Sequence, residues 1–534
     1  MDPSRFFAKS FEKCRLGGIS CLVPNGIFRL ECVVVSQLRI TLYEQAAVGM
    51  AADGIGWIRM WRLRERYVNP DMSPDVDMVS PVIKATTEQP FSTRFVPALC
   101  IGVLLLFTFR QYTFAYFWLD DFNNLHWIQQ WSLLDGIGHV FSPSAQYFRP
   151  VGMLVYQIAF NLFDRDPRPY HWLMWAIHSL NVAIVYVVLK RFTESRAGAA
   201  VGAMLFAYPP IFTDIFWSFG TIFELIGAAL FFTGMLLWQR KSRSLAIVLA
   251  SCAVFILAIK TKEMAITLPA VWLLQDVLLR RPLKWKEFGA IVLPGLIGAW
   301  YGLQKLSEMR APDPNQPYYM DFHGIVMGRG FGFYFNTLFD TNLRWQIWCI
   351  GFTVVLLILL ALKWRLAAFF QMYVFVTFLP LIFLVNHRGP FYWYFPMLGV
   401  CGLAALLVKT ATERVTSRIS PRRLAPYGAF AFALLCLVYF IHSSRATAVQ
   451  REQQQDISEK YRGFVESLQQ LPPPDQGETL FFTSVPDYFD ADALRFASEL
   501  ALHRSDIAVK LVQESPPDAR YRLVFENSRV SIRH

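Results

Sequence analysis

Charged residues are scarce in this sequence: 17% of the 534 residues are charged, whereas 54% are hydrophobic and 16% are aromatic. A typical soluble domain has about 25% charged residues, so the composition argues against a soluble enzyme. No Cys-x-x-Cys spacing occurs, and the eight cysteines lie in the first 90 residues or in apolar runs, so neither a disulfide framework nor a cysteine metal site is expected. Residues 1–90 contain no apolar run of spanning length and do not resemble a signal peptide.

Long apolar runs recur after residue 90, and they approach or reach the roughly 20 residues that a membrane-spanning helix needs. We expect about eleven spans, near residues 94–115, 170–190, 197–212, 218–238, 244–260, 264–280, 287–305, 346–362, 367–386, 392–408 and 426–442. Residues 323–340 are interpreted as a helix at the outer interface, because a twelfth span would place the basic loop "KWR" outside. The predicted fold class is an all-α polytopic membrane protein with a small C-terminal α/β domain.

Basic residues gather in a few short loops, and their positions predict the orientation of the chain. The loops "KRFTESR", "QRKSR", "RRPLKWK", "KWR" and "KTATERVTSRISPRR" all face the cytoplasm if the N-terminus does. Eleven spans then place the C-terminus outside. The net charge of +11 is therefore attributed to loops that contact anionic membrane lipids, not nucleic acid. We expect an integral protein of a bacterial inner (plasma) membrane.

Three regions are expected along the chain. Residues 1–90 are predicted to be a poorly ordered cytoplasmic segment, or an upstream extension of a protein that starts near Met72 or Met78. Residues 91–442 form the transmembrane domain, whose long outer loop, 116–169, is predicted to carry function. Residues 443–534 read as strand, helix, strand and strand, a small extracytoplasmic domain that packs on the membrane domain.

The outer loop is predicted to begin with helical structure. Leu125, Ile128, Trp131 and Leu134 recur at helical spacing, and a second helix is expected over 149–163.

Two adjacent carboxylates, Asp120 and Asp121, follow the first span directly in "FWLDDFNNLHW". Such a pair alone is more often a helix cap or a solvated turn than a catalytic site. It is accompanied, however, by further polar motifs that all fall on the outer side of the predicted topology: "YFRP", "RPYHW", "PPIFTDIFW", "KTKEMAITLP" and "NHRGPFYWYFP". Acidic groups at membrane depth are costly and therefore favour a functional cavity.

This set of motifs resembles the C-type (GT-C) integral-membrane glycosyltransferases that use a polyprenyl-phosphate sugar, closest to the protein O-mannosyltransferase-like branch. The resemblance covers about residues 94–400 and implies that Asp120 and Asp121 are catalytic. It implies a substrate cavity formed by His171, Asp214, Glu224, Glu263, Tyr392 and Tyr394. Met174 stands where the family usually has Asn, and the C-terminal region lacks the tetratricopeptide repeats of some members.

Inverting transfer of a sugar from a lipid phosphate requires a base for the acceptor hydroxyl and cations for the departing phosphate. Arg149, Lys262 and Arg388 are the candidate phosphate ligands, although Lys262 beside Glu263 could form only an ion pair. His178, inside a predicted span, is interpreted as a satisfied core histidine.

The expected function is that of a hexosyltransferase with a polyprenyl-phosphate sugar donor and a protein or glycan acceptor in the cell envelope. A divalent metal ion, Mg²⁺ or Mn²⁺, could assist. The alternatives are a lipid-linked glycan polymerase or ligase and a polytopic transporter. The transporter is disfavoured because no matching pair of Gly- or Pro-broken spans occurs in two halves.

Overall fold

The computed structural model describes residues 29–34, 38–43, 91–110, 112–144, 147–240, 243–279, 285–309, 318–419, 421–486, 489–504, 506–516 and 519–533. The chain divides into two compact units, Met1–Thr86 and Thr87–His534. In the first unit, strands β1 (Arg29–Val34) and β2 (Leu38–Tyr43) pair antiparallel. The other residues of the segment 1–90, which was predicted to be poorly ordered, lie outside the described residues.

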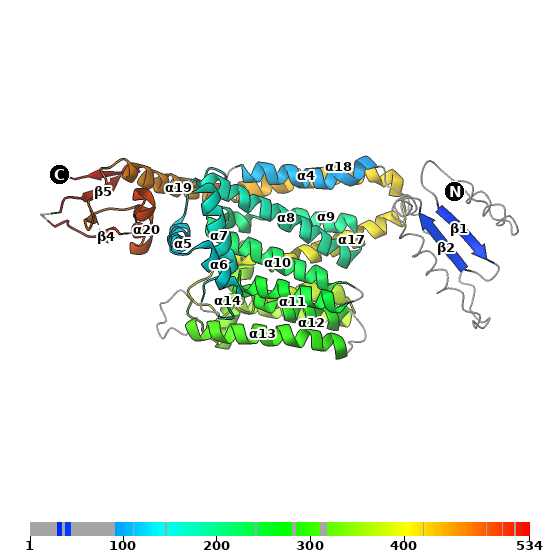
Figure 1. Ribbon diagram of the computed structural model, residues 1–534. Helices are drawn as coiled ribbons and strands as arrows, with labels where there is room; N and C mark the ends of the chain where they lie inside the picture. Colours follow the sequence, from blue (N-terminus) through cyan, green and yellow to red (C-terminus); the bar gives the residue numbers. More distant parts are fainter. Residues whose placement is uncertain are drawn as a thin grey trace, which may run out of the picture. The chain divides into compact units, whose positions relative to one another are not determined.

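The second unit is mainly helical, which confirms the predicted fold class, and every predicted span contains a helix. Its membrane-type helices are α4 (Phe91–Phe109), α8 (Pro167–Thr193), α9 (Arg196–Ala207), α10 (Ile222–Trp238), α11 (Leu245–Ile259), α12 (Leu268–Leu279), α13 (Trp285–Met309), α15 (Trp345–Ala361), α16 (Arg365–Phe378), α17 (Met397–Thr416) and α18 (Pro421–Ala446). Figure 1 shows α8, α9, α10 and α17 as neighbouring helices.

Three stretches of the described residues are long and apolar enough to cross a membrane: Pro167–Thr193, Phe219–Trp238 and Pro426–Ala446. A fourth candidate is the pair Arg196–Ala207 and Pro210–Phe216, whose axes differ by 54°. This bend follows from Pro209 and Pro210, because proline and the residue before it disfavour a continuous helix. The number of about eleven spans therefore stays a prediction.

Helices α9 and α17 approach each other closely because α9 has glycine at two positions one turn apart. A Cβ at Gly198 would lie 2.3 Å from the Ala405 carbonyl oxygen, and one at Gly202 would lie 2.9 Å from the Cys401 carbonyl oxygen. Small residues at such spacing let two helix backbones come together in membranes. We infer that these glycines fix the distance between α9 and α17.

The first outer loop forms three helices, α5 (Leu119–Gln129), α6 (Leu133–Phe141) and α7 (Pro150–Phe163), of which α7 confirms the predicted second helix. The expectation of one continuous helix through Leu134 was wrong. Ser132 caps α6, its hydroxyl accepting a hydrogen bond from the Asp135 backbone N–H at 3.2 Å. This serine and the acid three residues later form a capping box, which starts a new helix at that point.

The segment 323–340 is helical, as predicted: it forms α14 (Gly324–Phe339). Gly328 and Gly332 lie on Trp345, at the start of α15, so α14 packs against the next helix. Its place at the outer membrane interface stays a prediction.

Beyond α18, the long helix α19 (Ala448–Gln469) leads to a four-stranded sheet with strand order β4-β3-β5-β6. The predicted strand, helix, strand and strand are confirmed as β3 (Thr479–Phe482), α20 (Ala491–Leu502), β4 (Ala508–Leu511) and β5 (Arg522–Glu526). Strand β3 is parallel to β4 and β5, and β6 (Arg529–Ile532) is antiparallel to β5. Strand β6 was not predicted, although Asn527 and Ser528, with φ of 51° and 58°, form a turn typical of two-residue hairpins.

The C-terminal elements contact the membrane domain directly, as predicted. The Tyr116 backbone N–H donates to Ser458 Oγ at 2.6 Å, and Arg462 donates to the Phe114 carbonyl at 2.5 Å. Ser458 and Arg462, both on α19, therefore hold the segment that leads into α5.

We predict the orientation from the basic loops, and reporter fusions test it. A reporter that is active only outside the cytoplasm should work when fused after Ile441, near the end of α18, because eleven spans place that end outside. The same reporter fused after Arg243 should be inactive. The opposite activity in either fusion would reverse the topology and move the site described below to the cytoplasmic face.

Candidate functional site

Asp121 is the most extensively bonded carboxylate of the predicted site, and its side chain is fully buried. It accepts hydrogen bonds from the Tyr156 hydroxyl at 2.7 Å, the Ser218 hydroxyl at 3.1 Å and the Gly220 N–H at 2.6 Å. It also accepts from the N–H groups of Trp118 and Phe219 at 2.8 and 3.2 Å. One carboxylate therefore ties the start of α5 to α7 and to the turn before α10.

The protonation of Asp121 reflects this environment. Burial raises its pKa to about 6, although its hydrogen bonds lower it. All of its acceptor capacity is directed at protein donors. Asp121 therefore has the contacts of a structural carboxylate, one of which caps the start of α5, and its catalytic role stays a prediction.

Asp120 lies beside Asp121 but has the opposite environment. It is exposed to solvent, and within the described residues its carboxylate accepts no hydrogen bond. The protein around Asp120 nevertheless displaces water, and this desolvation raises the pKa of its carboxyl group. The positive charge of Arg149 lowers that pKa, and the negative charge of Glu224 raises it. Asp120 is thus an accessible carboxylate whose basicity is increased, as a general base requires.

Arg149 stands at the start of α7 in a strained backbone conformation, with φ of 42° and ψ of 56°. Its Nε lies 3.1 and 3.2 Å from the two carboxylate oxygens of Glu263, and its Nη2 lies 3.1 Å from Glu263 Oε2. Burial raises the pKa of Glu263, but Arg149 and Lys262 lower it by more, to about 2. A left-handed non-glycine residue costs about 1–3 kcal/mol and commonly marks a functional site.

Lys262 forms a second buried ion pair, with Glu224 on α10. Its ammonium also lies 5.2 Å from the centre of the Tyr392 ring, within cation–π distance. Burial and the charge of Arg149 lower the pKa of Lys262, whereas Glu224 and Glu263 raise it. Two cations, Arg149 and Lys262, and two anions, Glu263 and Glu224, thus alternate beside Asp120. These four residues come from α7, α10 and the segment before α12.

Two residues of this cluster, Tyr318 and His387, were not predicted from the sequence; their ring centroids are 4.7 Å apart. Burial raises the pKa of Tyr318, and the positive charge of Arg149 partly offsets this by lowering it. The pKa of His387 is lowered to about 4 by burial and by the charges of Lys262 and Arg149, so this imidazole is neutral at neutral pH. Tyr318 carried no sequence signal. His387 lies in the motif "NHRGPFYWYFP", from which Arg388, Tyr392 and Tyr394 were selected but not the histidine.

The structure does not bring the other predicted site residues into this cluster. The Nε of Arg388 donates to the Leu384 carbonyl at 2.7 Å, and Asp214 accepts from the side-chain amides of Gln450 and Gln454 on α19. Tyr394 lies in the core, where its hydroxyl contacts His178 at 2.7 Å and Asn181 at 3.0 Å. His171 is buried on α8. The roles assigned to Arg388, Asp214, Tyr394 and His171 stay predictions.

His178 was interpreted as a satisfied core histidine, and its contacts confirm this. Its second ring nitrogen, Nε2, lies 2.9 Å from the Ala207 carbonyl oxygen, and its side chain is buried.

A divalent metal ion was considered from the sequence, and the donor set decides whether one fits. Among the described residues, no group of three or more His, Cys, Asp or Glu side chains could hold a metal ion. Glu224 and Glu263 are already engaged by Lys262 and Arg149. The divalent metal ion therefore stays a prediction, and we derive no step through one.

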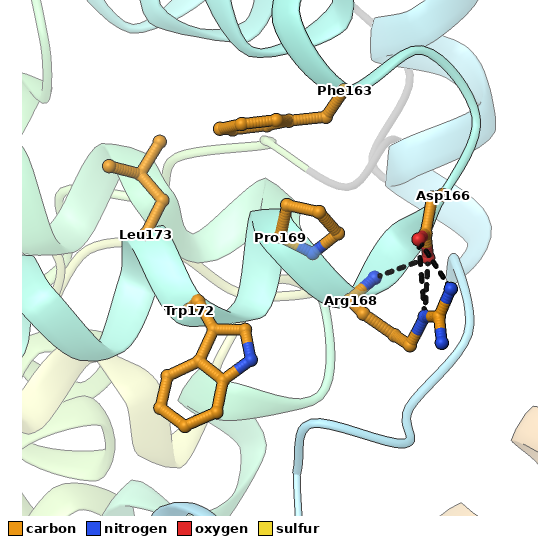
Figure 2. A pocket seen from close by; sticks show the side chains of 6 residues that line it. All are labelled: Phe163, Asp166, Arg168, Pro169, Trp172 and Leu173. Carbon is orange, nitrogen blue, oxygen red and sulfur yellow. Dashed lines mark hydrogen bonds and ion pairs between the residues drawn. The ribbon is translucent and has the colours of Figure 1, made fainter.

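A surface hollow of about 610 Å³ lies elsewhere, at the start of α8 (Figure 2). Phe163, Pro169, Trp172 and Leu173 form its apolar wall, and Arg168 pairs with Asp166 at its edge, with 2.7 Å between Nη2 and Oδ2. Trp172 is half exposed. The hollow contains no predicted site residue and is typical of the aromatic level of a membrane protein.

Asp490, the N-cap of α20, raises the pKa of Asp120 through its negative charge. We predict that Asp490→Asn lowers the pKa of Asp120, because the charge is removed while asparagine still caps the helix. Asp120 is a base only when it is deprotonated. The acid limb of the pH dependence of kcat/KM for any reaction in which Asp120 is the base should therefore move to lower pH. An unchanged or upward-shifted limb would show that Asp490 does not act on the base.

The chain matches no protein-family model and no curated protein sequence. Among solved structures it is similar to ArnT from Cupriavidus metallidurans bound to undecaprenyl phosphate, with 14% identity, 78% of this chain and 86% of that chain covered and a TM-score of 0.46. The apo state of the same ArnT gives 14% identity, the same coverage of 78% and 86%, and a TM-score of 0.47. The assignment to the protein O-mannosyltransferase-like branch stays a prediction.

Proposed function

We propose that this protein transfers a sugar from a polyprenyl-phosphate donor to an acceptor hydroxyl of a protein or glycan, with inversion, on the outer face of a bacterial inner membrane. The observation that carries the proposal is the arrangement of Asp120. An accessible carboxylate without a hydrogen bond among the described residues stands next to two buried cations, Arg149 and Lys262.

The proposed reaction uses these groups as follows. The acceptor oxygen attacks the anomeric carbon of the sugar, the bond from that carbon to the phosphate oxygen breaks, and Asp120 takes the hydroxyl proton. The polyprenyl phosphate leaves with the electron pair of the broken bond. Because the leaving group is already a phosphate, the step needs little acid catalysis.

The two cations would hold the departing phosphate. Glu263 occupies Nε and Nη2 of Arg149, whereas Nη1 makes no hydrogen bond within the described residues and can donate to a phosphate oxygen. Lys262 acts as a point charge next to it. Glu224 and Glu263 hold both cations in place when no donor is bound.

The test is transfer by the purified protein in lipid nanodiscs, given a panel of radiolabelled undecaprenyl-phosphate hexoses and pentoses together with a cell-envelope fraction. We expect one donor to lose its label to an envelope acceptor and to leave undecaprenyl phosphate. Growth of a repeating glycan would instead support a polymerase or ligase. Uptake of label into sealed vesicles without cleavage of the donor would support a transporter and contradict the proposal.

A further inference from the structure

Helix α5, which carries Asp120, is attached on two sides. Asp121 joins its first turn to the turn before α10, as described above. On another side, α20 of the C-terminal domain packs against α5, and the two helices lie next to each other in Figure 1. The outer domain therefore contacts the same short helix that presents the proposed base.

The contact between α5 and α20 is made by a buried polar pair. His126 Nδ1 lies 2.5 Å from Glu499 Oε2, with exposed side-chain fractions of 12% and 7%. The His126 ring stacks on Phe496, with centroids 4.1 Å apart and planes inclined by 24°. Arg495 Nε donates to the other oxygen of Glu499 at 2.8 Å. A carboxylate that is buried to this extent is retained only when it is paired and hydrogen-bonded.

Aromatic rings extend the contact toward Asp120. The ring centroid of Phe122, on α5, lies 6.0 Å from that of Phe489, a residue that precedes α20 in the sequence. It lies 6.2 Å from the ring centroid of Tyr461, on α19. Tyr461 is fully buried and lies 5.8 Å from Trp118, the residue before α5. Contacts with the C-terminal domain therefore occur along one side of α5, from Trp118 to His126.

We propose that the His126–Glu499 pair positions the catalytic helix, so that the C-terminal domain sets the geometry of Asp120. His126 stands six residues after Asp120, about 9 Å along the helix axis, so the pair acts through a rigid helix and not by contact with substrate. This inference rests on the proposed function. Both residues are positioning residues in the sense that their effect passes through Asp120.

The alternative role of the pair is stability alone, and a double-mutant cycle separates the two. In full-length protein in nanodiscs, Glu499→Ala should lower kcat by about 10- to 100-fold, because a small misplacement of a catalytic group costs that much. The KM for the donor used by the wild type and the affinity for undecaprenyl phosphate should change less than about twofold, since Arg149 and Lys262 stand on other elements. Glu499→Gln keeps an acceptor for His126 and should restore most of kcat.

In the Asp120→Asn background, Glu499→Ala should cause no further loss, because the group it positions has already been disabled. Losses that multiply in the double variant would overturn the inference and leave the pair a purely structural role. A wild-type kcat in Glu499→Ala would also overturn it.

The matched control is Asp506→Ala, which removes an exposed ion pair of the same domain, with 2.5 Å between Arg504 Nη2 and Asp506 Oδ2. It should leave kcat unchanged, and an equal loss there would show general loosening of the domain and reject the inference. If Glu499→Ala does not fold, His126→Phe carries the same test, because it keeps the stacking on Phe496 and removes the polar contact. Absence of transfer by the wild type would refute the proposed function itself, whereas an active wild type with an active Glu499→Ala variant refutes only the positioning role.

Discussion

Asp120→Asn should abolish most sugar transfer while leaving the protein folded. The substitution preserves the size of the side chain and removes its basicity, and the native carboxylate makes no hydrogen bond within the described residues that the amide could break. General-base catalysis contributes about 10²- to 10⁴-fold, which corresponds to roughly 3–5 kcal/mol of barrier. We expect at least a hundredfold loss of kcat in the nanodisc assay, with an unchanged midpoint of thermal denaturation.

Its neighbour should behave differently. In Asp121→Asn, the new amide group has to face N–H and O–H donors that now bind the carboxylate, and each unsatisfied buried donor costs about 1–3 kcal/mol. The main effect is therefore lower thermal stability. Asp135→Asn is the matched control, an exposed carboxylate of the same outer loop that forms the capping box of α6 with Ser132. Near-native transfer by Asp120→Asn would show that the pair is only a cap and would refute the proposed mechanism.

Lys262→Met should lower both stability and donor affinity. Glu224 is buried, with 3% of its surface exposed, and it would lose its cationic partner. Removing one partner of a buried ion pair costs about 3–5 kcal/mol, because the remaining charge is uncompensated. The departing phosphate would also lose one of its two proposed ligands. The measurements are the midpoint of thermal denaturation and the affinity for undecaprenyl phosphate.

A second substitution separates these two effects. Lys262→Met combined with Glu224→Gln should recover much of the stability, because no buried charge remains unpaired, but it should not recover the affinity. Arg243→Met is the matched control, since it breaks another buried pair, in which Arg243 Nη2 lies 2.5 Å from Asp276 Oδ1. That variant should lose stability and keep donor binding. Recovery of both properties in the double variant would show that Lys262 serves only to neutralise Glu224.

Several features of the fold followed from the sequence, because they depend on local patterns. Apolar runs predicted the membrane-type helices, and the patterns of apolar residues after residue 478 predicted the strands β3, β4 and β5 and the helix α20. The break between α5 and α6 was missed, although Ser132 and Asp135 form a recognisable capping box. The count of spans could not be settled, because several of these helices are shorter than a typical span.

The sequence by itself determined the residue types of the site: an acidic pair after the first long apolar run, and Arg149, Lys262, Glu224 and Glu263 in motifs on one predicted face. Only the tertiary structure decided how they are used. Adjacent side chains on a helix point in different directions, so Asp121 turns into the protein and Asp120 toward solvent. Likewise, contacts between residues more than a hundred positions apart pair Arg149 with Glu263 and place α20 on α5, because such pairing depends on how helices pack and not on local pattern.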